Sequence, residues 1–142
     1  MATNVSKVEI NAPLNKVWHA LTNPALVKKW QYGSELTVDW KVGSEIRFRT
    51  EWEGKIFEQW GTLLEFVPNQ KLRYTLFAPR PDLEDKPENY LEMEYKLTKS
   101  GENTLVEITQ EDNRPGAIQE ETQGEENPVL KGLKDLIEAQ IE

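Results

Sequence analysis

The sequence contains no cysteine and a single histidine, His19. The missing thiols exclude disulfides, thiolate metal sites, iron–sulfur clusters and cysteine nucleophiles. A histidine-based metal site normally needs a second imidazole or a thiolate, so we expect no metal ion and no cofactor, with His19 at the surface. The chain also has no Gly-rich phosphate loop and no G-x-S-x-G elbow. Most enzyme classes that a sequence can reveal are therefore missing.

Long hydrophobic runs and an excess of basic residues are missing as well. No apolar run approaches the roughly 20 residues of a membrane-spanning helix, and the start of the chain has no signal-peptide core. Lys and Arg total 17 against 25 for Asp and Glu, so the net charge is -8. Such a charge repels phosphate backbones. We expect a soluble, cytoplasmic protein with no membrane span and no nucleic-acid partner.

The chain has enough residues and enough aromatic side chains for one folded domain. Its 142 residues suit a single domain, residues 1–142, that buries a core without a disulfide or metal. Charged residues make up 30% of the chain, but five Trp, four Tyr and four Phe are too many for a disordered one.

The first part of the chain predicts one strand followed by two short helices. Apolar and polar side chains alternate over Val5–Ile10, as in a half-buried strand. Pro13 then begins a helix with apolar residues at helical spacing. Asn23-Pro24 repeats this start signal for a second helix that ends near Trp30.

After Trp30 the apolar residues recur at a spacing of about two, which is typical of strands. Short turns such as Glu53-Gly54-Lys55 join neighbouring strands. Strands in this order form an antiparallel meander, so the fold class is α+β. The expected strands are Leu36–Trp40, Glu45–Trp52, Ile56–Phe66, Leu72–Leu76, Leu91–Leu97 and Thr104–Gln110.

The chain ends with an acidic segment and an amphipathic helix. We interpret Glu111–Asn127 as a solvated loop. Pro128–Glu142 carries an apolar stripe that needs the sheet as its partner. One helix cannot fill a curved sheet of about seven strands, so a cleft between helix and sheet is the expected place for a small molecule. The stripe consists of Leu130, Leu133, Ile137 and Ile141.

A set of motifs spans nearly the whole chain: Asn11-Ala12-Pro13 with Val17-Trp18, Ala20-Leu21-Thr22-Asn23-Pro24, Trp30, Val42-Gly43-Ser44, Ile46-Arg47-Phe48, Gly61 to Pro68, Leu72 to Thr75, Thr104 to Thr109 and Leu133 to Leu136. This set resembles the START-like (SRPBCC) superfamily. Within it, the set is most similar to the AHSA-type group, the homologues of the C-terminal domain of the heat-shock-protein-90 ATPase activator.

The resemblance implies a helix-grip fold, in which a curved antiparallel sheet wraps around a long C-terminal helix. It also implies either ligand binding, since members bind lipids, polyketides or hormones, or a role with a chaperone. Two positions depart from the group's pattern. Ser44 stands in place of a second Gly, and Val129 and Leu130 stand where an aromatic residue is common. Both changes leave the fold intact but alter one wall of a cavity.

Glu58 is the most unusual candidate for a functional residue. If Trp60, Leu64 and Phe66 face the core, alternation puts Glu58 on the same apolar face, where a carboxylate is costly to bury unless it is paired. There it would anchor a ligand or act as an acid/base with a raised pKa. A bulge that shifts the register by one residue would instead send it to solvent.

Aromatic and apolar side chains complete the candidate site, although a set at this spacing is also typical of plain core. We expect the side chains from the strands to line the cavity and those from the last helix to close it. The candidate ligand-binding residues are Phe48, Glu58, Trp60, Tyr74, Met93, Tyr95, Leu133 and Ile137.

Three functions remain open. The leading hypothesis is a non-catalytic module that holds a small apolar or amphipathic molecule, with Glu58 as the polar anchor. The second is a protein-partner module of the chaperone-activator type, which would use the acidic surface around Glu111–Glu126 to meet a basic partner. The third is a cyclase- or hydrolase-like enzyme with Glu58 as acid/base. The protein would be a monomer or a homodimer.

Overall fold

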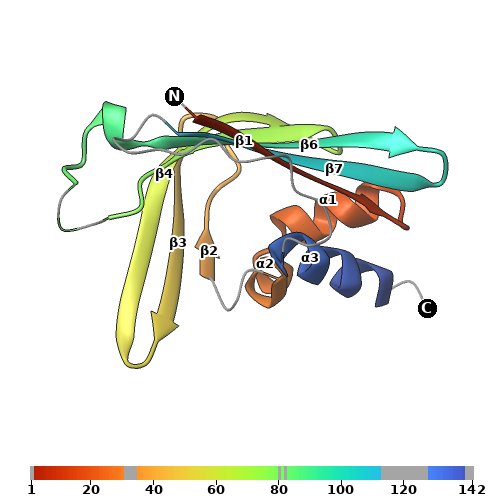
Figure 1. Cartoon of the computed structure of the whole chain (residues 1–142), viewed down its shortest axis with the longest axis horizontal. Helices are drawn as coiled ribbons and strands as arrows, with labels where there is room; N and C mark the ends of the chain where they lie inside the picture. The colour runs from red at the N-terminus through yellow and green to blue at the C-terminus, as the bar shows by residue number, and fades with distance from the viewer. Residues whose placement is uncertain (1, 31–34, 80, 82, 113–127, 140–142) are drawn as a thin grey trace.

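The computed structural model describes residues 2–30, 35–79, 81, 83–112 and 128–139. A seven-stranded antiparallel sheet carries three α-helices on one face (Figure 1). We call the face toward the helices the inner face and the opposite one the outer face.

The N-terminal elements follow the sequence prediction. Strand β1 (Ala2–Ile10) leads into helix α1 (Leu14–Thr22) and helix α2 (Pro24–Trp30). Asn23 lies between the two helices and makes a hydrogen bond with each of them. Its N–H donates to the carbonyl of His19 at 2.9 Å, and its Oδ1 accepts the N–H of Ala25 at 2.9 Å.

The other strands run as the predicted meander, in the sheet order β1-β7-β6-β5-β4-β3-β2, with β1 paired to β7. Strand β2 is shorter than predicted and ends at Thr37, and Trp40, the last residue of the predicted strand, takes a φ of 56°, outside the range of a strand. The loop before β6 holds a short 3₁₀ turn, Pro87–Asn89. The strands are β2 (Glu35–Thr37), β3 (Glu45–Trp52), β4 (Lys55–Val67), β5 (Lys71–Leu76), β6 (Leu91–Ser100) and β7 (Asn103–Asp112).

Residues with positive φ close the hairpins where the sequence predicted turns. Glu53 and Gly54, with φ of 51° and 78°, form a two-residue turn between β3 and β4. Asn69, with φ of 62°, follows Pro68 in a turn closed by the Gln70 N–H. Figure 1 shows the β3–β4 hairpin bending away from the other long strands, toward the side of the helices.

Helix α3 (Pro128–Ala139) is fixed at the β1 edge of the sheet, against β1, α1 and α2. It buries Leu130, Leu133 and Ile137. Lys134 donates to the Glu9 carbonyl at 2.9 Å, and Glu138 accepts the Asn11 N–H at 2.8 Å. Other side chains must therefore fill the inner face at the β3–β5 end.

A β-bulge in β4 decides which residues of that strand face the helices. Leu63 pairs with Tyr74, but Glu65 pairs with Arg73, so Leu64 is an extra residue. Phe66 faces the inner side as predicted, yet alternation before the bulge is reversed. The expectation that Glu58 and Trp60 face the core is therefore wrong, and both lie on the outer face.

Gly61 lies where β4 passes from its pairing with β3 to its pairing with β5. A Cβ atom built on Gly61 would overlap the carbonyl oxygen of Thr75. The Thr62 N–H also donates to Thr75 Oγ1 at 2.9 Å, which holds the two strands together at this point. Only glycine permits this approach of the backbones.

We expect Gly61→Ala to lower the free energy of unfolding by about 2–3 kcal/mol, because a methyl group must push β4 and β5 apart. Chemical denaturation followed by circular dichroism measures the loss. Gly101→Ala is the matched control, since its φ is 63° but no atom lies near an added methyl group. That control should lose only about 1 kcal/mol, and equal losses would contradict the close approach.

Candidate functional site

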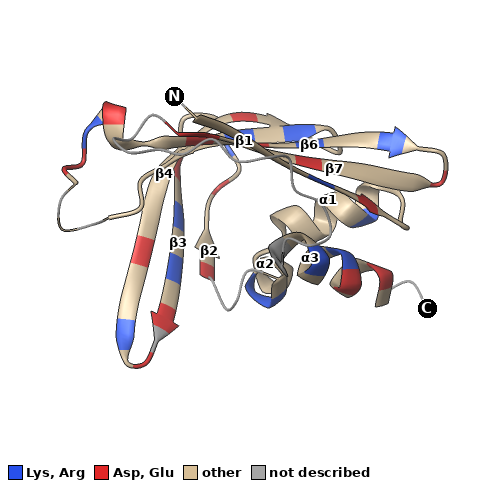
Figure 2. Ribbon diagram, viewed as in Figure 1, with Lys and Arg blue, Asp and Glu red and all other residues tan. Residues whose placement is uncertain are grey.

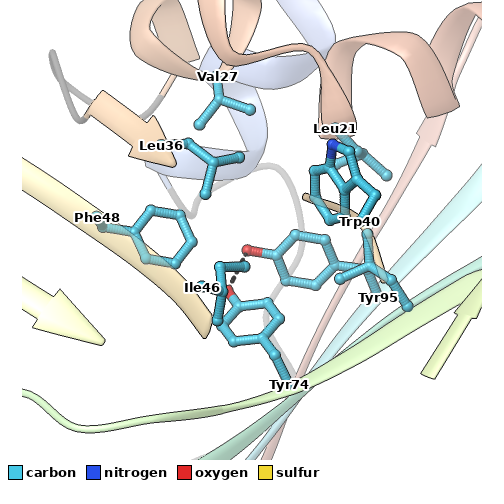
Figure 3. Close-up of a pocket in the computed structure, with 9 residues that line it drawn as sticks. Leu21, Val27, Leu36, Trp40, Ile46, Phe48, Tyr74 and Tyr95 are labelled. Atoms are coloured by element: carbon cyan, nitrogen blue, oxygen red, sulfur yellow. Dashed lines mark hydrogen bonds between the residues drawn. The ribbon is translucent and has the colours of Figure 1, made fainter. Parts of the chain in front are cut away.

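A pocket lies on the inner face, where β3, β5 and β6 meet α1, α2 and β2 (Figure 3). The free space in it is about 10 Å³, which is room for one water molecule. The lining residues are Leu21, Val27, Leu36, Trp40, Ile46, Phe48, Leu72, Tyr74 and Tyr95.

The lining is uncharged and has one buried polar feature. The hydroxyls of Tyr74 and Tyr95 share a hydrogen bond of 2.9 Å (Figure 3). Burial, followed by the charge and hydrogen bond of Tyr95, raises the pKa of Tyr74 well above its ordinary value. Tyr74 therefore stays neutral at physiological pH, and the pocket offers neutral hydrogen-bonding groups within apolar walls.

Aromatic rings from three strands form a row across the pocket. The rings of Phe48 and Tyr74 lie 5.8 Å apart, and those of Tyr74 and Tyr95 lie 5.8 Å apart at 75°. The register explains the row, because Leu72 pairs with Tyr95 and the alternate residues of β5 and β6 share the inner face. Each ring pair stabilises the fold by about 0.5–1.5 kcal/mol, in addition to the free energy gained by burying its apolar surface.

The loop before β3 supplies the remaining aromatic wall. The Trp40 indole stacks on Phe66 with ring centroids 5.2 Å apart and an angle of 24° between the planes. Phe66 in turn contacts Trp18 of α1, at 5.5 Å between centroids. Trp40 itself is half-buried.

The structure brings part of the predicted ligand-binding set together. Phe48, Tyr74 and Tyr95 line the pocket. Met93 lies beside Tyr74 on the inner face and packs, half-buried, against the core. Leu133 and Ile137 are buried on α3 but do not line the pocket. Ligand contact by any of these residues stays a prediction.

Glu58 and Trp60 belong to a separate cluster on the outer face. Glu58 accepts a 2.5 Å hydrogen bond from Arg47, and 39% of its side chain is exposed. The Arg47 guanidinium lies 5.1 Å from the centre of the Trp60 ring, whose N–H donates to Asp85 at 3.1 Å. Figure 2 shows the basic and acidic positions of this hairpin side by side on β3 and β4.

Sequence reasoning left out most of the pocket walls. Apolar periodicity marks these residues as buried but cannot separate a pocket wall from core. Trp40 fits the alternation of the predicted strand Leu36–Trp40, but its actual position depends on a left-handed backbone that this pattern does not reveal. The residues left out are Leu21, Val27, Leu36, Trp40, Ile46 and Leu72.

Two other expectations concern surfaces and ions. Within the described ranges, no helix is long and apolar enough to cross a membrane. The same residues contain no group of three acidic or histidine side chains placed to hold a metal ion. The acidic surface expected around Glu111–Glu126 lies outside the described residues, except for Glu111 and Asp112 at the end of β7.

The antiparallel sheet, the two short helices after β1 and the C-terminal helix define a protein of the helix-grip, START-like class, as expected. The family model "Activator of Hsp90 ATPase homolog 1-like protein" matches residues 11–138. The chain belongs to this family, which confirms the resemblance inferred from its motifs.

Solved structures agree with this assignment. ChR145 from Cytophaga hutchinsonii is 35% identical, with a TM-score of 0.73 over 96% of this chain and 95% of that chain. The Aha1 dimer from Colwellia psychrerythraea is 19% identical, with a TM-score of 0.62 over 82% and 81%. An HSP90 activator from Plasmodium falciparum is 18% identical, with a TM-score of 0.63 over 82% and 76%. A search among curated proteins found no match.

The tyrosine pair predicts a measurable coupling. Tyr74→Phe or Tyr95→Phe alone leaves the other buried hydroxyl without this bond, so each should lower the free energy of unfolding by about 1–2 kcal/mol. The double variant should lose about 1 kcal/mol less than the sum of the two. Denaturant unfolding of the four proteins measures this cycle, and additive losses would show that the hydrogen bond contributes nothing.

Proposed function

We propose that the protein binds a small, neutral, mainly apolar molecule in the pocket between the inner face of the sheet and helices α1 and α2. The observation that carries the proposal is the lining, in which uncharged walls surround the buried hydroxyls of Tyr74 and Tyr95. Apolar walls with few polar groups are typical of small-molecule sites.

The chemistry of the walls limits the ligand. A charged group would lose its hydration without gaining an opposite charge from the lining, which is strongly unfavourable. The rings of Phe48 and Tyr74 favour a ligand with a flat, unsaturated part. A hydroxyl or carbonyl group on the ligand would find its hydrogen-bonding partner at the tyrosine pair.

The ligand enters only if the walls move apart. The present space of about 10 Å³ is far below the 150 Å³ or so that a benzene-sized molecule occupies in an engineered cavity. Strand β2 is suited to such a movement, since it has three residues and pairs only with β3 at the edge of the sheet.

The predicted site residues take different parts in this proposal. Phe48, Tyr74 and Tyr95 contact the ligand, and Met93 packs beside Tyr74. Leu133 and Ile137 take no direct part, because they lie in the core on α3 and do not line the pocket. Glu58 and Trp60 take no part, because both face the other side of the sheet. The ion pair of Glu58 with Arg47 also gives no support to its proposed role as acid/base.

Phe48→Ala tests the proposal, with the neutral fluorescent probe N-phenyl-1-naphthylamine as the ligand. Removing the ring gives up its contact with the probe but supplies the volume that the closed pocket lacks. Because the small space of about 10 Å³ is what limits binding, we expect the affinity to tighten about fivefold or more. Fluorescence titration measures the affinity.

Leu133→Ala is the control for this experiment. It also creates a cavity in the core, but not at the pocket wall, so the probe affinity should change less than about twofold. Binding by neither the original protein nor Phe48→Ala would contradict the proposal. An equal gain in both variants would place the probe in general core cavities instead.

A protein-partner function is the second candidate, favoured by the apolar end of the β3–β4 hairpin. Ile56 is 51% exposed on the outer face and Phe57 is 54% exposed on the inner face, next to the turn. They point to opposite faces, but both lie near the end of a hairpin that bends away from the other long strands, where a partner that grips the hairpin contacts both (Figure 1). The similarity to an HSP90 activator suggests a chaperone of that class as the partner.

Chaperone ATPase activity tests this second candidate. The protein should raise the ATPase rate of a purified Hsp90-type chaperone, and Ile56→Ser with Phe57→Ser should remove the increase without lowering the melting temperature. Val42→Ser is the control, since Val42 is 65% exposed but outside the hairpin. An unchanged chaperone rate in the presence of the original protein would rule this function out.

A further inference from the structure

Trp40 differs from every other residue of the pocket wall. The other eight residues belong to helices or strands, and Trp40 alone lies in the loop between β2 and β3. Its half-buried indole forms one side of the pocket in Figure 3. A wall residue in a loop can move without breaking the hydrogen bonds of a sheet or helix.

The backbone of Trp40 is strained. Its φ of 56° lies in the left-handed region, which a bulky side chain disfavours. Among the described residues, the other non-glycine residues with positive φ are Glu53 and Asn69, and they occupy the centres of hairpin turns that require this conformation. Trp40 instead lies just before the nearest turn, in which the Ser44 N–H donates to the carbonyl of Lys41 at 3.0 Å.

The stacking of the indole on Phe66 holds this strained backbone in place. The chain on the C-terminal side is anchored independently, because Gly43 N–H donates to the carbonyl of Leu63 at 2.8 Å and Leu63 N–H donates to that of Ser44 at 3.0 Å. The Trp40 backbone can therefore relax while the pairing of β3 with β4 stays intact. Strain favours movement of the indole outward and stacking favours its present position, so two states compete.

We propose that Trp40 is the gate of the pocket. Stacked on Phe66, the indole closes the space to the size of one water molecule; released, with its backbone in the extended region, it gives a small molecule access to the tyrosine pair. This inference rests on the proposed function for its purpose, but the movement itself can be measured without a ligand.

Thiol labelling tests the gate, because the natural chain has no cysteine to interfere. Ile46 is 1% exposed and lines the pocket, so the Ile46→Cys thiol reports entry of the neutral reagent N-ethylmaleimide. With Trp40 present, we expect this thiol to react at least about tenfold faster than a thiol in the closed core. Adding Trp40→Ala should accelerate it by about a further tenfold.

Leu133→Cys supplies the core thiol, since Leu133 is fully buried but does not line the pocket. Its rate should change less than about twofold on adding Trp40→Ala, which separates gate opening from general unfolding. Equal protection of both thiols in the presence of Trp40 would overturn the gate. So would an equal acceleration of both by Trp40→Ala.

A second measurement addresses the strain directly. Glycine adopts positive φ without penalty, so Trp40→Gly should melt at a higher temperature than Trp40→Ala, the reverse of the usual order. A lower melting temperature for Trp40→Gly would contradict the strain on which the gate depends.

The outcomes distinguish the gate from the proposed function. Suppose that Trp40→Ala accelerates the labelling of Ile46→Cys but N-phenyl-1-naphthylamine does not bind. That result would support the gate and contradict the ligand-binding function. Probe binding with no effect of Trp40→Ala on the labelling rates would support the ligand-binding function and contradict the gate.

Discussion

Strand β4 pairs with β3 along its first part and with β5 along its last, and this double pairing determines which side chains meet the helices. The change of partner requires Gly61, where a side chain would collide with Thr75, and an extra residue at Leu64. Because side chains alternate, the bulge reverses the two faces of the strand before it. Leu63 therefore reaches the core, while Glu58 meets Arg47 outside. The bulge therefore keeps Glu58 away from the inner face, where the pocket lies.

The position of α3 has a second consequence for the same region. With that helix bonded to the β1 edge through Glu9 and Asn11, the far end of the inner face is covered mainly by side chains. Phe48, Tyr74 and Tyr95 fill it from the strands, and Trp40 fills it from a loop. Aromatic rings, and not backbone, therefore enclose much of this space. Rings can change rotamer without loss of secondary structure, so movement of these side chains alone can enlarge the pocket.

The sequence predicts the element order well because turns and periods are local. The positive φ of Glu53 and Asn69 follows from turn chemistry next to Gly54 and Pro68, and Pro24 marks the start of α2. Phe48 also lies on the inner face as expected, since no irregularity interrupts the alternation of β3. The predicted inner face of β4 is wrong before Leu64. A bulge there reverses which residues face the helices, and no distinctive residue in the sequence marks its position. Trp40 is beyond sequence reasoning for a related reason: its left-handed backbone goes against its local preference, and its indole stacks on Phe66, a residue distant in the sequence.

The balance at Trp40 bears on how a ligand would be recognised. Unstacking the indole from Phe66 costs about 0.5–1.5 kcal/mol beyond the apolar surface exposed, and release of the left-handed backbone returns about 1–2 kcal/mol. Since these two contributions nearly cancel, the exposed surface of the indole sets the remaining cost of opening, and a minor open state of about 0.1–10% is the expected scale. The apparent affinity of any ligand is then reduced by that fraction. A weak apparent affinity for a neutral molecule is therefore consistent with a well-matched site. A flat ligand that replaces the indole against Phe66 would recover the lost stacking as well, and this gives a physical reason for selectivity toward aromatic molecules.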